Sequence, residues 1–248
     1  MASEAARRLR TGLPLAIGSL IMVALGRIPT VLFLGALSAG AGGEAATLLE
    51  RRRPGVVTAA VSALALVAGY GLGLWAVPLA VFTWWAVTWQ PPSGWSRAIV
   101  AGLLLGGGPA ALGVLMSTDS WLGWLAVLAV AVFGGESAAW LVGSQVGRHL
   151  LAPRVSPHKT WEGAAAQGLF GVATGLVAAI WIPPSEALWL GLAGGIAGQV
   201  GDLAQSWCKR RAGVKDSGSV FGAQGGFFDL IDGLLGAALA AAPLLLLA

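Results

Sequence analysis

Long, nearly uninterrupted apolar segments are the feature of this 248-residue chain that most restricts its fold. Charged residues make up 10% of the sequence and hydrophobic residues 56%. A helix needs roughly 20 apolar residues to cross a bilayer, whereas isolated strands would leave backbone groups unpaired in lipid. The sequence therefore predicts an all-α, polytopic transmembrane protein rather than a soluble domain.

About nine segments are long and apolar enough to be candidate membrane spans. They cover residues 12–26, 29–49, 55–72, 73–90, 98–117, 120–146, 163–183, 186–206 and 225–248. We expect a single polytopic membrane domain over 1–248, with an apolar helical block at about 1–117 and a catalytic half at about 118–248. The run 106–109, Gly-Gly-Gly-Pro, predicts a kink because proline removes a backbone donor.

Most cations of the chain fall in loops on one side of this predicted arrangement. Cytoplasmic loops of membrane proteins carry an excess of lysine and arginine, so the amino terminus is predicted to be cytoplasmic. We expect a multi-pass protein of the inner, cytoplasmic membrane, in contact with the bilayer and with no nucleic-acid partner. The cations on this side are Arg7, Arg8, Arg10, Arg51, Arg52, Arg53, Arg97, Arg148, Arg154, Lys159, Lys209, Arg210, Arg211 and Lys215.

Acidic residues inside the apolar segments converge on one predicted depth. Glu136 lies about 24 Å into its segment at 1.5 Å per residue, near the cytoplasmic end, and Glu44 lies near the inner end of the second segment. Asp202 is close to the inner end of the eighth segment, and Asp229 and Asp232 lie in the first two turns of the ninth. Because a carboxylate in hydrocarbon is costly, such acids indicate a functional site.

The spacing of these acids indicates a metal. Asp229 and Asp232 are three residues apart and share a helix face, as do Asp202 and Ser206 at a spacing of four, with Gln199 one turn earlier. Oxygen-only ligands suit a hard cation such as Mg²⁺, which completes its shell with water and substrate phosphate. The alternative is that each acid pairs with a loop cation at the membrane interface. Four acids at one depth favour the metal site.

Other polar features carry weaker signals. A glycine-rich loop that includes Gly225 and Gly226 can turn backbone amides toward a phosphate at the start of the last helix. The glycine-rich stretch 191–201 predicts close contact between helices. Cys208 is the single cysteine, which excludes a disulfide framework, and its neighbours favour an inert interfacial thiol over a nucleophile.

Two motifs lie in the second half of the chain. The segment at 206–232 reads SWCKRRAGVKDSGSVFGAQGGFFDLID, and the segment at 156–163 reads SPHKTWEG. They resemble the phosphatidate cytidylyltransferase (CDP-diacylglycerol synthase) family, whose signature is S-x-x-K-R-x4-K-D, a glycine-containing loop and H-G-G-x-x-D-R-x-D, preceded by an S-P-K-K-T-W-E-G loop. Asp202 matches the family's G-D upstream of the signature, and the likeness covers roughly residues 134–232.

The resemblance implies transfer of a cytidylyl group from CTP to phosphatidate, which gives CDP-diacylglycerol for phospholipid synthesis. It implies that Asp202 and Asp229 hold Mg²⁺, with Asp232 as a further or supporting ligand and a second cation such as K⁺ in the same site. The expected catalytic residues are Asp202, Ser206, Lys209, Arg210, Lys215, Asp216, Asp229 and Asp232. The expected substrate-binding residues are Ser156, Lys159, Thr160, Glu136, Gly225, Gly226 and Gln224. A homodimer is expected from the likeness alone.

Four positions depart from the family pattern. Gln224 stands where the family has histidine, Leu230 where it has arginine, Gln205 where it has glutamate and Glu136 where it has aspartate. They leave alternatives open: a synthase for another lipid phosphate, a polyprenol or phytol kinase, or a non-catalytic homologue that binds lipid or nucleotide. A transporter is a further alternative, disfavoured because the acids stop at one leaflet.

Overall fold

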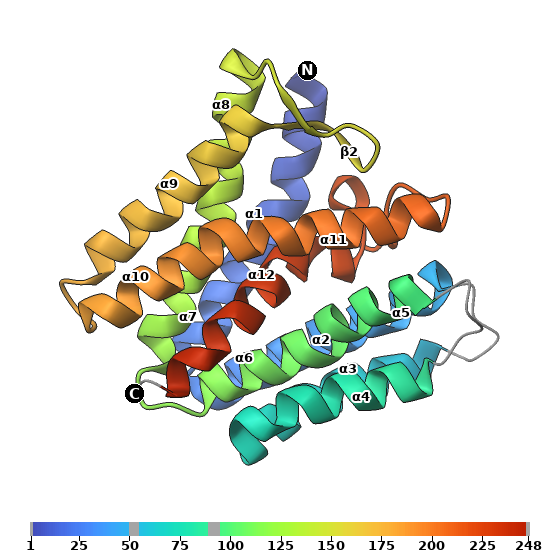
Figure 1. The fold of residues 1–248 in the computed structure, drawn as a ribbon, viewed down its shortest axis with the longest axis vertical. Helices are drawn as coiled ribbons and strands as arrows, with labels where there is room; N and C mark the ends of the chain where they lie inside the picture. The colour runs from blue at the N-terminus through green and yellow to red at the C-terminus, as the bar shows by residue number, and fades with distance from the viewer. Residues whose placement is uncertain (1, 50–54, 89–94, 247–248) are drawn as a thin grey trace.

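The computed structural model describes residues 2–49, 55–88 and 95–246, which are mostly helical, as the sequence predicts. The helices of the first half are α1 (Ala2–Ala24), α2 (Arg27–Leu48), α3 (Gly55–Leu72), α4 (Ala76–Val87), α5 (Trp95–Gly102) and α6 (Gly108–Met116). Those of the second half are α7 (Trp121–Ala129), α8 (Gly135–Val146), α9 (Trp161–Ala178), α10 (Pro184–Leu192), α11 (Gly198–Arg211) and α12 (Phe227–Ala241) (Figure 1). The loop cations Arg51, Arg52 and Arg53 lie outside the described residues.

Among the described residues, five helical stretches are long and apolar enough to cross a membrane. They are Arg27–Ala46, Gly55–Val87, Trp95–Met116, Trp121–Val146 and Phe227–Leu244. The stretch Gly55–Val87 is not straight: Gly73 has a φ of +62° and Trp84 Nε1 donates a hydrogen bond of 3.0 Å to Ser62 Oγ. The chain therefore folds back on itself between α3 and α4.

Three long helices each contain a π-helical turn, at η3 (Leu103–Gly107), η4 (Val130–Gly134) and η5 (Ala193–Ala197). The turn η3 ends where the sequence predicts a kink, directly before Gly108 and Pro109. Such turns are often found at functional sites. Here η4 directly precedes the segment that carries Glu136, and η5 directly precedes the segment that carries Asp202.

The loop between α8 and α9 contains a short β-hairpin that the all-α prediction missed. The strands β1 (Leu150–Ala152) and β2 (Ser156–Thr160) pair antiparallel, with Leu150 opposite Thr160 and Ala152 opposite Ser156. Trp161 N donates to His149 O at 2.8 Å and extends the pairing by one bond. The remaining described turns are the 3₁₀ segments η1 (Gly73–Trp75), η6 (Gly222–Gln224) and η7 (Ala242–Leu246).

The helix α12 lies at the centre of the molecule and contacts α11, α6 and α2 (Figure 1). Its side chains Phe228, Ile231 and Leu235 are buried. One apolar cluster combines them with Leu37 from the first half and Leu128 from the second. The apolar block and the half that carries the polar motifs therefore share a core.

Glycines allow α11 and α12 to approach closely, as the sequence predicts for the stretch 191–201. A Cβ atom added at Gly201 would lie 2.6 Å from Asp232 O and 3.0 Å from Gly236 Cα. A Cβ atom at Gly236 would lie 2.8 Å from Ala197 O. Small residues permit such backbone contact between helices in membranes. This contact fixes the position of Asp202 relative to Asp232.

We predict that Gly201→Ala destabilises the protein, because its methyl group would clash with the backbone of α12. The cost of such overpacking is about 1–3 kcal/mol, measurable as a lower midpoint of thermal unfolding in detergent. The matched control is Gly35→Ala, where an added Cβ meets nothing within 4 Å. An equal effect of the two substitutions on the midpoint would contradict the prediction.

Candidate active site

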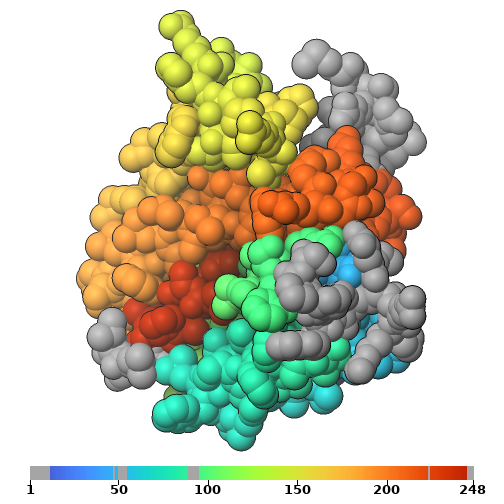
Figure 2. Space-filling model, turned by 45° about the vertical axis from the view of Figure 1, so that its right-hand side comes forward, coloured from blue at the N-terminus to red at the C-terminus, as the bar shows by residue number. Residues whose placement is uncertain are grey.

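A polar cavity of about 310 Å³ lies among α8, β2, α9 and α11. Figure 2 shows the yellow surface of the hairpin region directly above the orange surface of α11, which bounds this part of the molecule. The polar residues that line the cavity are Glu136, His158, Lys159, Thr160, Gln167, Gln199 and Asp202. The motif at 156–163 therefore reaches the cavity through Lys159, and α11 reaches it through Gln199 and Asp202, just before the motif at 206–232 begins.

Asp202 is the acidic side chain best placed in this cavity. Lys159 Nζ lies 2.5 Å from Asp202 Oδ2, and both side chains are about one-quarter exposed, at 24% and 25%. Ser206 Oγ donates to Asp202 Oδ1 at 3.2 Å, which confirms the predicted pairing along one face of α11. The ion pair is therefore partly accessible from the cavity, and an incoming anion can compete with Asp202 for the ammonium group of Lys159.

Two further acids lie close to Asp202. Asp232 is 7% exposed and interacts electrostatically with both Asp202 and Glu136. Glu136 in turn interacts with Asp202 and Lys159. Three helices thus bring three carboxyl groups together, as the sequence predicts. Like charges repel strongly where water is scarce, so this cluster favours binding of additional positive charge.

Asp229 occupies a different environment, in which its carboxylate accepts five hydrogen bonds. Lys209 Nζ and Gln205 Nε2 donate to Oδ1 at 2.6 and 2.7 Å. The amide and hydroxyl groups of Ser217 and the amide of Gly226 donate to Oδ2 at 2.8–2.9 Å. The side chains of Lys209 and Asp229 are only 11% and 8% exposed. Charge-assisted bonds of this kind are among the stronger hydrogen bonds in proteins.

Glu44 binds the amino terminus of α12 from the first half of the chain. Its carboxylate accepts hydrogen bonds from Phe227 N at 3.0 Å and Phe228 N at 3.1 Å, and its Oε2 lies 2.7 Å from Ser217 Oγ, whose single hydroxyl proton it shares with Asp229. The first amides of a helix have no partners within the helix, and the helix dipole favours a negative charge there. Glu44 therefore supplies a cap from another helix.

The glycine loop is shaped around these two carboxylates. Gly225 has a φ of +83°, and a Cβ atom there would meet the carboxylate of Asp229. A Cβ atom at Gly226 would likewise meet Glu44. Of the amides that the sequence predicts for a phosphate, that of Gly226 donates to Asp229 at 2.9 Å and that of Gly225 donates to Gly222 O at 3.2 Å in this structure.

Other predicted site residues lie at the margin of the cavity or outside it. Thr160 Oγ1 accepts a hydrogen bond from Gly163 N at 3.1 Å and so caps α9. Arg210 donates to Val155 O at 3.1 Å and to Val214 O at 3.2 Å, and so ties the hairpin to α11. Ser156 begins β2. Lys215 and Asp216 are exposed, and Gln224 lies against Gly12 of α1.

Sequence reasoning named Glu44 among the converging acids without giving it a role, and it left Ser217 and Gln167 out of the site. Glu44 and Ser217 complete the polar cluster at the start of α12. Gln167 is 1% exposed and lines the cavity; its Oε1 accepts from Gln199 Nε2 at 2.9 Å, and its Nε2 has no hydrogen-bond partner among the residues that the structure describes. The available signal was the isolation of Glu44 and Gln167 within apolar segments. Spacing alone could not tell which helix each one faces.

The oxygen atoms around the cavity suit Mg²⁺ in type, but they do not form a complete protein cage. Among the described residues, no three acidic, histidine or cysteine side chains are grouped closely enough to hold a metal ion. Mg²⁺ usually binds through one or two carboxylates and keeps water and phosphate ligands. Asp202 and Asp232 fit that mode. Asp229 would have to exchange at least one of its five donors to join them.

Cys208 is buried in α11, with 3% of its surface exposed. Burial raises the pKa of its thiol to about 12. The reactive thiolate is therefore scarce at neutral pH, in agreement with the inert thiol that the sequence predicts.

The known proteins to which this chain is similar in sequence carry cytidylyltransferase names. A family model described as the cytidylyltransferase family matches residues 6–248. A protein named phosphatidate cytidylyltransferase from Brucella suis biovar 1 (strain 1330) is 38% identical over 159 residues, 60% of this chain and 56% of the relative. One of the same name from Mycobacterium bovis is 31% identical over 132 residues, 52% of this chain and 43% of the relative. The chain spans about half the length of the curated relatives it matches.

We predict that Glu44→Gln weakens the start of α12, because the amide removes the charge that the helix terminus favours. The expected cost is about 1–2 kcal/mol, the scale of a charged hydrogen-bonding group at a partly buried helix end. Hydrogen exchange should accelerate at the amides of Phe227 and Phe228. Asp119→Asn, at a fully exposed acid, is the control. Unchanged exchange at both amides in Glu44→Gln would show that the cap contributes little.

Proposed function

The chain belongs to the cytidylyltransferase family, and from this premise we propose that it transfers a cytidylyl group from CTP to phosphatidate. The products are CDP-diacylglycerol, a precursor in phospholipid synthesis, and diphosphate. The observation that carries the proposal is the partly accessible Lys159–Asp202 ion pair in the polar cavity, with the two further acids Glu136 and Asp232 beside it. Such a site can bind an anionic phosphate and a divalent cation side by side. The names of the curated relatives support the choice of substrates.

The reaction requires positioning more than proton transfer. An oxygen of the lipid phosphate, which is already ionised, attacks the α-phosphorus of CTP; the bond to the bridging oxygen breaks and diphosphate leaves with the electron pair. Catalysis then depends on holding the two groups in line and neutralising charge. Lys159, on the rim of the cavity, can release Asp202 and bind a phosphate. Ser206, next to Asp202, is available to a phosphate or a bound water molecule.

We also propose that Mg²⁺ is the cofactor and that Asp202 and Asp232 hold it. Asp229 is a further candidate ligand, and a second cation such as K⁺ is a candidate for the same site. When bound, Mg²⁺ would neutralise phosphate charge and orient the diphosphate leaving group. The five donors on Asp229 support a distinct contribution from that residue. Asp229 holds the ammonium group of Lys209 in place, and this positive charge also interacts with Asp232.

Two of the four departures from the family pattern, Gln205 and Leu230, fit this arrangement. Gln205 is fully buried and donates to Asp229 through Nε2, whereas an ionised glutamate there would repel that carboxylate. Leu230 packs on the apolar core, so Lys209 supplies the positive charge on Asp229 without the family's arginine. These observations favour retained chemistry over a non-catalytic homologue.

For the membrane arrangement, we propose about nine spans, a cytoplasmic amino terminus, an inner-membrane location and a homodimer. The five apolar helical stretches support a multi-pass arrangement, and the one-sided distribution of loop cations in the sequence supports the orientation. A cavity near the cytoplasmic ends of the predicted spans 120–146 and 186–206 would let a water-soluble nucleotide meet a lipid held in the bilayer.

Purified protein supplied with CTP, phosphatidate and Mg²⁺ should form CDP-diacylglycerol and release diphosphate, and chelation of Mg²⁺ should stop the reaction. Release of CDP would instead indicate phosphoryl transfer, as in a lipid kinase. Binding of CTP without turnover would indicate a non-catalytic homologue. The proposal fails if no CDP-lipid forms from several phosphatidates while a known synthase is active in parallel.

Lys159→Ala should lower kcat/KM about a hundredfold or more, the usual effect of removing one charge-stabilising group. Asp202→Asn should have an effect of at least this size, and it should raise the Mg²⁺ concentration needed for half-maximal rate. Arg154→Ala is the matched control, since Arg154 is an exposed cation in the turn of the same hairpin. Equal activity of the Lys159 and Arg154 variants would exclude the proposed phosphate contact.

A further inference from the structure

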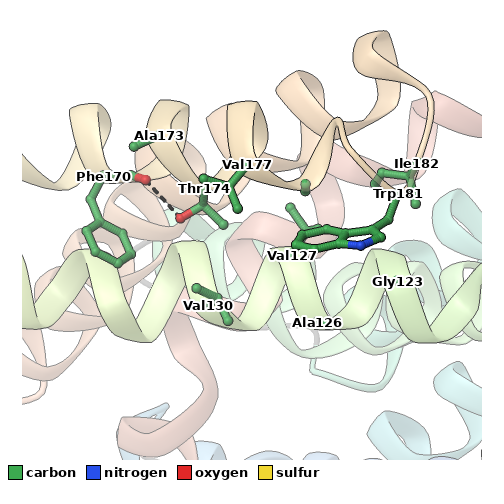
Figure 3. Close-up of a pocket in the computed structure, with 11 residues that line it drawn as sticks. Gly123, Ala126, Val127, Val130, Phe170, Ala173, Thr174, Val177, Trp181 and Ile182 are labelled. Carbon is green, nitrogen blue, oxygen red and sulfur yellow. Dashed lines mark hydrogen bonds between the residues drawn. The ribbon is translucent and has the colours of Figure 1, made fainter.

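An apolar groove of about 550 Å³ lies between α7 and α9, apart from the polar cavity (Figure 3). Ala126 and Val130 line it from one helix, and Phe170, Ala173 and Trp181 from the other segment. Thr174 contributes a polar side chain to the lining of the groove, but its hydroxyl donates to Phe170 O at 2.9 Å within α9. The groove therefore suits a hydrocarbon and offers little to a polar ligand.

The groove and the polar cavity lie along the same helix–helix seam. On α9, Gly163 and Gln167 line the cavity, while Phe170, Thr174 and Val177 line the groove. Their spacing of three and four residues places them on one face of the helix. On the opposite side, the helical stretch Trp121–Val146 is continuous and contributes lining residues to both spaces. A single ligand with a polar end and an apolar tail could therefore occupy both.

Phe170 marks the boundary between the two spaces. A Cβ atom added at Gly134 would lie 2.5 Å from Phe170 Cε1, so the ring packs directly on the backbone of η4. One turn earlier on α9, the buried Gln167 holds an unpaired Nε2 donor. A buried donor without an acceptor is costly. The acceptor that it lacks would be supplied by an ester or phosphate oxygen at the point where a glycerolipid changes from polar to apolar.

The size of the groove matches an acyl chain. From Phe170 to Ala178, α9 rises about 12 Å, and Trp181 and Ile182 continue the lining beyond the end of the helix. The hydrocarbon of one leaflet is about 15 Å thick, half of a typical bilayer core. At the other end of the seam, Lys159 supplies positive charge for a phosphate.

We propose that the seam between α7–α8 and α9 binds the lipid acceptor, with its phosphate in the polar cavity, its ester region at Gln167 and one acyl chain in the apolar groove. This inference rests on the proposed function for the identity of the acceptor as phosphatidate. It assigns lipid selection to α9, a helix that the sequence motifs leave out except at its first residues.

Photo-crosslinking tests the proposal without requiring turnover. Phosphatidate that carries a diazirine in one acyl chain should label peptides 121–130 and 170–182 of the purified protein, and unlabelled phosphatidate should compete. Phosphatidylcholine with the same modified chain should label them weakly, because its phosphate is blocked. Labelling elsewhere, or equal labelling by phosphatidylcholine, would overturn the proposal. So would no labelling by either lipid, the result expected if a second copy of the chain covered the groove.

A pair of variants tests the same seam by kinetics. Ala173→Phe should fill the groove and raise KM for dioleoyl phosphatidate about tenfold, the scale at which hydrophobic pockets penalise a poor fit. It should leave KM for CTP and for dihexanoyl phosphatidate unchanged. The control Leu176→Phe enlarges an exposed side chain that does not line the groove, and should leave all three unchanged.

These experiments separate failure of the inference from failure of the proposed function. If Ala173→Phe affects short and long acceptors equally, or neither, the groove does not hold the chain even though cytidylyl transfer stands. If the wild-type protein labels in the groove with phosphatidate but forms no CDP-lipid, the binding site stands and the proposed reaction falls.

Discussion

The rest of the structure depends on how two carboxylates hold the start of α12. Glu44 reaches from α2 and Asp229 from α12 itself, and together they accept hydrogen bonds from the loop before the helix and from its first amides. Lys209 pairs with Asp229 from α11. Removal of one partner from such a buried pair typically costs about 3–5 kcal/mol, because the other charge is left without compensation. This polar cluster therefore joins the two halves of the chain, which also share an apolar core.

This fixed point separates the acids into two sets with different contributions. The α11–α12 glycine contact sets the distance between the helices, and Asp232 follows Asp229 by one turn. Asp229 is saturated by donors, whereas Asp202 shares its charge with Lys159, which is about one-quarter exposed, and lies beside Asp232 and Glu136. We infer that the first set, Glu44 and Asp229, maintains the frame. We propose that the second set, Asp202, Asp232 and Glu136, would provide the negative charge for a cation that accompanies the nucleotide.

Much of this could be predicted from the sequence where the signal is local. Apolar length gave the helical membrane character, glycine spacing gave the close contact at Gly201, and the i and i+4 spacing gave the Asp202–Ser206 pair. The family resemblance, read from motifs at 156–163 and 206–232, is confirmed by the match over residues 6–248.

The remainder depends on contacts between distant parts of the chain. Glu44 and Phe227 are 183 residues apart, and no periodicity connects them. Spacing also placed Asp229 and Asp232 on one face without showing that Asp229 would be surrounded by donors. The hairpin at 150–160 is too short, and too interrupted by prolines, to show the alternation that predicts strands. Phe170 looked like an ordinary member of an apolar helix, and the isolated polar residue Gln167 gave no sign of the side that it faces.

A structure of the protein with CTP and Mg²⁺ would test most directly whether the two sets of acids differ in this way. The account predicts density for the ion between Asp202 and Asp232, Lys159 turned from Asp202 toward a phosphate, and the Asp229–Lys209 pair unchanged. An ion bound to Asp229 in place of Lys209, with Asp202 still paired to Lys159, would contradict it.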